Sequence, residues 1–238
     1  MRKFRWMVVA AALAFALAAL AADPWKEKAP EQWSQSEVQK ILNDSPWSRP
    51  YEVMQQSFAA GGSGNDMVGG TGGASSGGGK RKTSGSDESM QNGRFITYVA
   101  QWYSSRTVRA AQLRKAVFAG AAPGSDHPLL QVPENYQVVL QSADMSLFAK
   151  LGDGLKKTTY LEMKTTHQRI APSQVIVLQG NGGRPLGVAF EFPKKTASGE
   201  PTVAADEKSI DFVSGTDDLK LKFRFDLGKM IDQKGADL

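Results

Sequence analysis

The chain has 238 residues, 41% of them hydrophobic, and 29 Lys+Arg against 24 Asp+Glu give it a formal charge of +5. This length allows one or two domains at roughly 150 residues each, and the apolar fraction is sufficient for a packed core. The sequence contains no Cys and two His, which excludes disulfide scaffolds, Cys-ligated metals, thiol catalysis and lipid attachment through Cys.

The first segment has the composition of a secretory signal peptide. Three basic residues stand within positions 2–5, and an apolar run follows from 7 to 22. The run is shorter than the about 20 residues of a membrane span, and the small residues that end at Ala21 are typical of a cleavage site. We therefore expect residues 1–21 to be a signal peptide and the protein to be exported to the periplasm or beyond after cleavage near Ala21. The alternative is an uncleaved segment, and only in that case do we expect contact with a membrane.

Cleavage would change the charge of the protein. Without the three basic residues of the signal peptide, 26 Lys+Arg remain against 24 Asp+Glu, a balance of +2. Domains that bind nucleic acid usually carry a clustered basic charge, whereas a small net charge mainly concerns solubility. We therefore expect no nucleic-acid partner.

Residues 22–58 are predicted to contain one short helix and one weak strand. Ser34 and Glu37 have the spacing of a capping box, which predicts a helix over 35–44. A helix of this length is marginal in water on its own, and the strand expected at 51–58 alternates only weakly. We therefore expect residues 22–58 to dock on the main domain.

Three of the four tryptophans outside the signal peptide lie close together at this end of the chain, at Trp25, Trp33 and Trp47. The favoured interpretation is packing, because Trp33 precedes the capped helix, Trp47 follows it, and a short helix needs an anchor. The alternative is an aromatic contact surface for a partner, since Trp is enriched at interfaces. That partner would be an envelope protein or polymer whose identity the sequence does not reveal.

Residues 59–92 are rich in Gly and Ser and nearly free of large apolar side chains, with ten of the 24 glycines between 61 and 79. This composition predicts a flexible coil. The coil is either a long hairpin loop between the strand at 51–58 and a stronger strand at 95–103, or a linker between two modules. The hairpin loop is favoured because residues 22–58 could not fold alone. The stretch 73–80 resembles a phosphate-binding loop only superficially, since it lacks required residues of that motif.

A second helix is expected near 106–119, at the start of a β-rich domain that we place at 93–238. Its apolar face is narrow and consists of Ala110, Leu113 and Val117. Basic residues occupy much of the rest of the helix, and we interpret them as surface charges.

The remainder of the chain has the patterns of β-strands. In the clearest of them, at 219–227, Leu and Phe alternate with charged residues, as in a sheet with one face on a core. The continuous apolar run at 175–178 predicts a strand buried on both faces. The predicted fold class is α+β: mostly an antiparallel β meander or sandwich, with one short N-terminal helix and one helix near 106–119.

The sequence offers few candidates for catalysis. His127 follows Asp126 in a loop, and His167 follows a predicted strand that contains Glu162. A histidine with a carboxylate partner can act as a general acid or base, but the sequence has no H-E-x-x-H or S-x-x-K motif. We therefore assign no catalytic residue, no metal ligand and no cofactor.

Three stretches share features with other proteins. They are Trp33 with the Ile-Leu-Asn-Asp-Ser-Pro-Trp box at 41–47, the segment 101–110, and the segment 190–193 together with the charged alternating strand that ends at Met230. In these stretches the chain resembles a loose group of uncharacterised exported bacterial proteins with an N-terminal Trp…Leu-Asn-Asp-Ser-Pro-Trp box. The resemblance implies export and this architecture, and it supplies no site residue. We therefore expect a binding or structural role in the envelope or extracellular space; the alternative is an envelope hydrolase with a loop His/carboxylate site.

Overall fold

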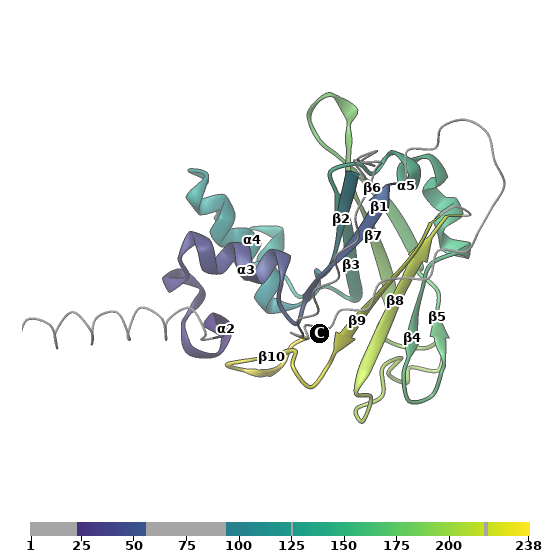
Figure 1. Cartoon of the computed structure of the whole chain (residues 1–238). Helices are drawn as coiled ribbons and strands as arrows, with labels where there is room; N and C mark the ends of the chain where they lie inside the picture. The colour runs from purple at the N-terminus through teal and green to yellow at the C-terminus, as the bar shows by residue number, and fades with distance from the viewer. Residues whose placement is uncertain (1–22, 56–93, 125, 217–218) are drawn as a thin grey trace, which may run out of the picture.

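The structure is a computed structural model that describes residues 23–55, 94–124, 126–216 and 219–238 (Figure 1). The expected signal peptide at 1–21 and the expected Gly/Ser-rich segment at 59–92 lie outside the described residues. The described part has the predicted α+β class and is dominated by antiparallel β-sheet.

The strands form two large sheets and one small hairpin. In spatial order, the first sheet contains β1 (Ser48–Gln55), β2 (Arg94–Trp102), β3 (Asn135–Ser142), β7 (Pro185–Pro193) and β6 (Gln174–Gln179). The second contains β5 (Arg169–Ile170), β4 (Tyr160–Met163), β8 (Ser209–Gly215) and β9 (Lys220–Asp226). The hairpin consists of β10 (Ile231–Asp232) and β11 (Gly235–Ala236). All of these pairings are antiparallel.

The helices are short and gather mainly beside the first sheet. They are α2 (Pro24–Glu27), α3 (Gln35–Asn43), α4 (Arg106–Phe118) and α5 (Ser146–Leu151), with 3-10 turns η1 (Pro30–Gln32), η2 (Pro128–Leu130), η3 (Gly152–Lys157) and η4 (Asn181–Gly183). Figure 1 shows α2, α3 and α4 together on one side of the sheets, next to the β10 hairpin. The two helices predicted from the sequence correspond to α3 and α4. Within the described ranges, no helix has the length and apolar character needed to span a bilayer.

The two large sheets pack face to face through aromatic side chains. The ring of Phe212 in β8 lies 5.4 Å from that of Phe190 and 6.3 Å from that of Phe192, both in β7. Nearer the sheet edges, Tyr51 of β1 meets Phe223 of β9 with ring centroids 5.8 Å apart. Tilted and edge-on contacts of this kind are favourable beyond the apolar area that they bury. The main core therefore lies between the two sheets.

Strands β1 and β2 join the N-terminal residues to the rest of the fold. They pair from Ser48 opposite Gln101 to Gln55 opposite Arg94. The strands expected at 51–58 and 95–103 are thus neighbours in one sheet, and the residues before and after the Gly/Ser-rich segment share one hydrophobic core.

Helix α3 begins where local sequence predicts. The Ser34 hydroxyl accepts a hydrogen bond from the Glu37 backbone N–H at 3.3 Å, and the Glu37 carboxylate accepts one from the Ser34 backbone N–H at 2.8 Å. The face formed by Val38, Ile41 and Leu42 is buried. A reciprocal cap and a continuous apolar face thus determine this short helix.

The prediction that the run at 175–178 is buried on both faces is wrong. This run belongs to β6, which lies at the edge of its sheet and pairs only with β7. Val175 and Val177 are partly buried, while Ile176 on the other face is 37% exposed. A run of apolar residues fits both a central and an edge strand, because the sequence does not show which neighbours the strand will have.

The predicted packing face of α4 is correct only in part, since Ala110 packs partly buried against the core. Val108 and Ala111 are the fully buried apolar side chains of this helix, whereas Val117, which we expected to pack, is 39% exposed. Figure 1 shows that the C-terminal part of α4 extends away from the sheets. Only the first turns of the helix are enclosed. The burial of a side chain in α4 therefore depends on how far along the helix it lies, and not only on which face of the helix it occupies.

Candidate functional site

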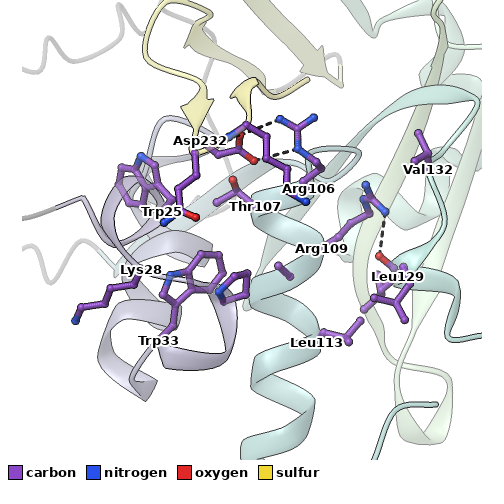
Figure 2. Close-up of a pocket in the computed structure, with 15 residues that line it drawn as sticks. Trp25, Lys28, Trp33, Arg106, Thr107, Arg109, Leu113, Leu129, Val132 and Asp232 are labelled. Atoms are coloured by element: carbon purple, nitrogen blue, oxygen red, sulfur yellow. Dashed lines mark hydrogen bonds and ion pairs between the residues drawn. The ribbon is translucent and has the colours of Figure 1, made fainter. Parts of the chain in front are cut away.

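A pocket of about 280 Å³ lies where four segments that are distant in the sequence meet. We call it the α4 pocket. Figure 2 shows Trp25 and Trp33 of the N-terminal segment on one side of α4, Leu129 and Val132 on the other, and Arg109 pointing toward the latter pair. Residues 232–234, in the turn between β10 and β11, complete the lining.

The walls of the α4 pocket are mostly apolar. The apolar side chains that line it besides the two tryptophans are Pro30, Ala110, Leu113, Leu129, Leu130 and Val132. The polar lining is dominated by cations, with Lys28, Arg106, Arg109 and Lys234 against one carboxylate, Asp232. Apolar walls with a few fixed polar groups are the usual composition of a small-molecule site.

The C-terminal tail holds one side of this pocket in place. The Asp237 carboxylate, which is 1% exposed, accepts hydrogen bonds from the backbone N–H groups of Arg106 at 2.7 Å and Thr107 at 2.9 Å. The Trp47 indole N–H donates to the main-chain oxygen of Asp237 at 2.7 Å. The first N–H groups of a helix have no partner within the helix, and a carboxylate is favoured there. Asp237 therefore fastens the tail to the start of α4.

Arg106 and Asp232 connect the same helix to the β10 hairpin. Nε of Arg106 donates to Asp232 Oδ2 at 3.0 Å and Nη2 donates to Oδ1 at 2.9 Å, the bidentate geometry of a strong arginine–carboxylate pair. Burial opposes ionisation of Asp232, but the hydrogen bonds from Arg106 and from the Lys234 backbone N–H outweigh it, and the pKa of Asp232 lies below its usual value. The pair therefore fixes the position of the hairpin beside the pocket.

Arg109 is the most buried cation of the pocket, with an exposed fraction of 6%. Its Nε donates to the carbonyl of Ser104 at 3.3 Å, and its Nη1 donates to the carbonyls of Leu129, at 3.0 Å, and Gln131. Burial lowers the pKa of Arg109, an effect that the charge of nearby Asp237 opposes. Within the described residues, none of the hydrogen bonds of Arg109 goes to a carboxylate.

A second cation supports the loop that forms the far wall. Lys194 Nζ donates to the Pro133 carbonyl at 2.8 Å. Burial, and to a smaller extent the charge of Arg109, lower the pKa of Lys194. Arg109 and Lys194 together hold carbonyls along residues 129–133, and this explains how a loop without long secondary structure can form a defined wall.

The three tryptophans that the sequence singled out are all buried. The rings of Trp25 and Trp47 meet edge-on with centroids 5.4 Å apart, and the Trp33 indole N–H donates to the Pro24 carbonyl at 3.1 Å. Each is at most 3% exposed. They therefore pack in the interior and do not form an exposed aromatic surface, although Trp25 and Trp33 also line the α4 pocket.

The structure does not bring the histidines into a site with carboxylates. His127 Nδ1 accepts a hydrogen bond from the Leu129 backbone N–H at 3.2 Å, which stabilises a turn. His167 is exposed in a turn after β4, with a φ of 57°. Glu162 pairs with Arg169 at 3.1 Å. Among the residues that the structure describes, no three His, Asp or Glu side chains are grouped as metal ligands would be.

Sequence reasoning missed Arg106 and Arg109, which it treated as surface charges. A signal was present, because both residues fall at the start of the predicted helix at 106–119. Cations are unfavourable at the positive end of a helix, so two arginines there point to partners outside the helix. The structure supplies them as Asp232 for Arg106 and the 129–131 carbonyls for Arg109.

Comparison with known proteins places the chain in no family: no family model matches it, and neither a curated protein nor a solved structure matches it. We therefore infer function from the chemistry of the α4 pocket. The features that matter are its apolar walls, its buried arginine and the ion pair that fixes its rim.

Proposed function

We propose that the protein is exported to the bacterial envelope or the extracellular space and binds a small ligand in the α4 pocket. Export is supported by the basic start, apolar run and small residues of the segment 1–21. Binding is supported by the pocket itself. The protein would then act by capturing or presenting its ligand.

The observation that carries the binding proposal is the combination of apolar walls with polar donors whose positions are fixed. The volume of about 280 Å³ lies just below the roughly 300–1,000 Å³ typical of small-molecule sites. Arg106 is held by Asp232, and Arg109 by the carbonyls of Leu129 and Gln131. A site whose donors are already ordered loses less conformational entropy when a ligand binds.

Export is tested by cell fractionation. The full chain is expressed in a bacterium, and the N-terminus of the recovered protein is sequenced. We expect a mature protein outside the cytoplasm that begins near Ala22. An Ala21→Arg variant should remain uncleaved, because signal peptidase requires small residues at this position, while a Lys26→Arg control should be processed normally. A full-length protein found only in the cytoplasm would rule out export.

Binding is tested by a thermal-shift screen of the purified protein against small anionic, neutral and cationic compounds. Ala110 lines the pocket, so an Ala110→Leu variant should fill part of it. Ala116 lies on the same helix outside the lining, and Ala116→Leu is the matched control. We expect compounds that raise the Tm of the wild type and of Ala116→Leu but not that of Ala110→Leu. If the screen gives no such compound, the α4 pocket is not the binding site that we propose.

A further inference from the structure

Two of the cations that line the α4 pocket are already paired. Arg106 binds Asp232 through two hydrogen bonds, and Lys28 Nζ lies 2.6 Å from a carboxylate oxygen of Glu37. Asp237 Oδ1 also lies 3.7 Å from Nε of Arg106, so both cations have carboxylate partners within the protein. A ligand anion gains little charge attraction from Arg106 or Lys28, because carboxylates of the protein already neutralise these two cations.

Arg109 differs from both. It is buried, yet its hydrogen bonds go only to neutral carbonyls, and its Nη2 makes no hydrogen bond with any described residue. The charge of Asp237 acts on Arg109, but the Asp237 carboxylate is bound to backbone N–H groups of α4 and not to the Arg109 guanidinium. A buried charge without a directly bound partner of opposite sign is costly. Lys234, at the rim of the same pocket, likewise makes no direct ion pair within the described part of the chain and adds a second positive charge.

The second sheet contains another buried charge, Asp211, which can be compared with Arg109. The Asp211 carboxylate is 1% exposed, and it forms ion pairs with Lys222 Nζ at 2.9 Å and with Arg224 Nε at 2.8 Å. Asp211 therefore carries two counter-charges within the protein. Arg109 carries none at hydrogen-bond distance, and it lies in the lining of a pocket large enough to admit a ligand.

The apolar part of the pocket lining indicates a second property of the ligand. Leu130 and Val132 are 52% and 77% exposed, and with Leu113 they give the pocket an apolar surface that is open to water. Covering such a surface is favourable in proportion to its area. A ligand that covers this surface therefore needs an apolar part.

We propose that the ligand of the α4 pocket is a small carboxylate with an apolar body. Its carboxylate accepts a hydrogen bond from Nη2 of Arg109, and its apolar body covers Leu113, Leu130 and Val132. This inference rests on the proposed binding function and adds the chemical class of the ligand.

The test compares three probes by isothermal titration calorimetry with the purified protein. Octanoate has both the charge and the apolar chain, octan-1-ol has the chain alone, and acetate has the charge with almost no chain. We expect octanoate to bind with one site per chain and the other two probes to bind about tenfold or more weakly. Octan-1-ol lacks the hydrogen bond to a charged group, which contributes about one to two orders of magnitude in affinity, and acetate lacks the apolar chain that covers the walls of the pocket.

Variants of the protein then identify which cation binds the carboxylate of octanoate. Arg109→Gln should weaken octanoate about tenfold or more and leave octan-1-ol unchanged. Lys115→Gln, which removes an exposed cation of the same helix outside the lining, should leave both unchanged. Because Arg109 also supports the loop at 129–131, Arg109→Lys is measured as well, and it should retain most of the octanoate affinity. Ala110→Leu alters no charge and should abolish the binding of octanoate.

The outcomes distinguish failure of the proposed ligand class from failure of the proposed binding function. Equal affinities for octanoate and octan-1-ol, or equal losses in Arg109→Gln and Lys115→Gln, would overturn the carboxylate and leave the pocket as a binding site. Pocket-dependent hits from the thermal-shift screen that are all neutral or cationic would do the same. Octanoate binding that survives in Ala110→Leu would place the anion elsewhere on the protein and would count against both proposals.

Discussion

The β-sandwich and the helical end of the molecule share one hydrophobic core, but they differ in the contacts that supplement it. The helical end comprises α2, α3, α4 and the β10 hairpin. In the sandwich, the contact between sheets is made by rings such as Phe212 and Phe190. At the helical end, charged side chains bind backbone groups and one another, as Asp237 does at the start of α4 and Arg109 does at the 129–131 loop.

This difference explains where the candidate site lies. Apolar contact is non-directional and stabilises any arrangement that buries enough area, whereas a hydrogen bond requires a particular distance and angle. The contacts of the helical end therefore fix individual donors in space, and the α4 pocket lies among them. The sandwich supplies stability, and the helical end supplies positioned polar groups.

The largest effect is expected in the sandwich. Phe212 is fully buried against Phe190, Phe192 and Phe223, so Phe212→Ala should lower the free energy of unfolding by about 3–5 kcal/mol. Phe118→Ala is the control, because Phe118 is 42% exposed at the end of α4 and should cost about 1 kcal/mol or less. Urea denaturation followed by circular dichroism measures both. Equal losses would show that the contact between sheets is not the main source of stability.

The next effect is expected where the tail meets α4. Asp237→Ala leaves the Arg106 and Thr107 N–H groups without their acceptor and should cost about 2–3 kcal/mol. Asp237→Asn retains one acceptor oxygen and should cost less. Asp153→Ala, in an exposed turn, is the control and should have almost no effect. If denaturation curves do not distinguish Asp237→Ala from Asp153→Ala, the tail does not fasten the helical end.

Acid should weaken both regions through different carboxylates. Burial opposes ionisation of Asp211 and of Asp232, but hydrogen bonds from Arg224 and Lys222 in the first case and from Arg106 in the second lower both pKa values. A carboxylate whose pKa is lower in the folded state contributes stability above its unfolded value of about 3.9, and that stability is lost as the pH falls.

Unfolding free energies measured between about pH 5 and pH 3 should therefore decrease, and the decrease should be shallower in both Asp211→Asn and Asp232→Asn. Asp153→Asn, whose carboxylate is exposed, should follow the wild-type curve. A parallel decrease in all four proteins would show that neither pair contributes to the acid dependence.

A smaller effect is expected from the cap of α3. Ser34→Ala removes the acceptor for the Glu37 N–H and should cost about 1 kcal/mol. Ser36→Ala, in the first turn of the same helix, removes a hydroxyl of the same size without removing the cap. Thermal unfolding of the two variants should therefore differ in Tm. Equal Tm values would mean that packing of Val38 and Ile41 alone holds the helix.

The smallest effect is expected from deletion of residues 61–90. The ends of β1 and β2 pair at Gln55 and Arg94, and each doubling of the length of a connecting loop costs only about 0.6 kcal/mol. The Tm of the deletion variant should therefore lie within about 5 °C of the wild type. Loss of cooperative unfolding would show that this segment contributes to the fold rather than connecting two paired strands.

Local features were determined by the sequence alone. The capping box at Ser34 and Glu37 predicted α3, and the alternation at 219–227 predicted β9 with its buried Leu221, Phe223 and Phe225. Both signals depend on residues within one turn or one strand of each other, so no distant contact is needed to recognise them. The α+β class followed from the same local patterns.

The tertiary structure alone decided the rest. Whether the run at 175–178 is central or at an edge depends on how many strands pair with it, and the buried face of α4 depends on where the sheet and the C-terminal tail enclose the helix. The α4 pocket brings together residues from positions 25 to 234. The role of Arg109 is visible only there. Its charge follows from the sequence, whereas its burial and its hydrogen bonds, which within the described residues go to carbonyls and not to a carboxylate, depend on contacts between distant segments.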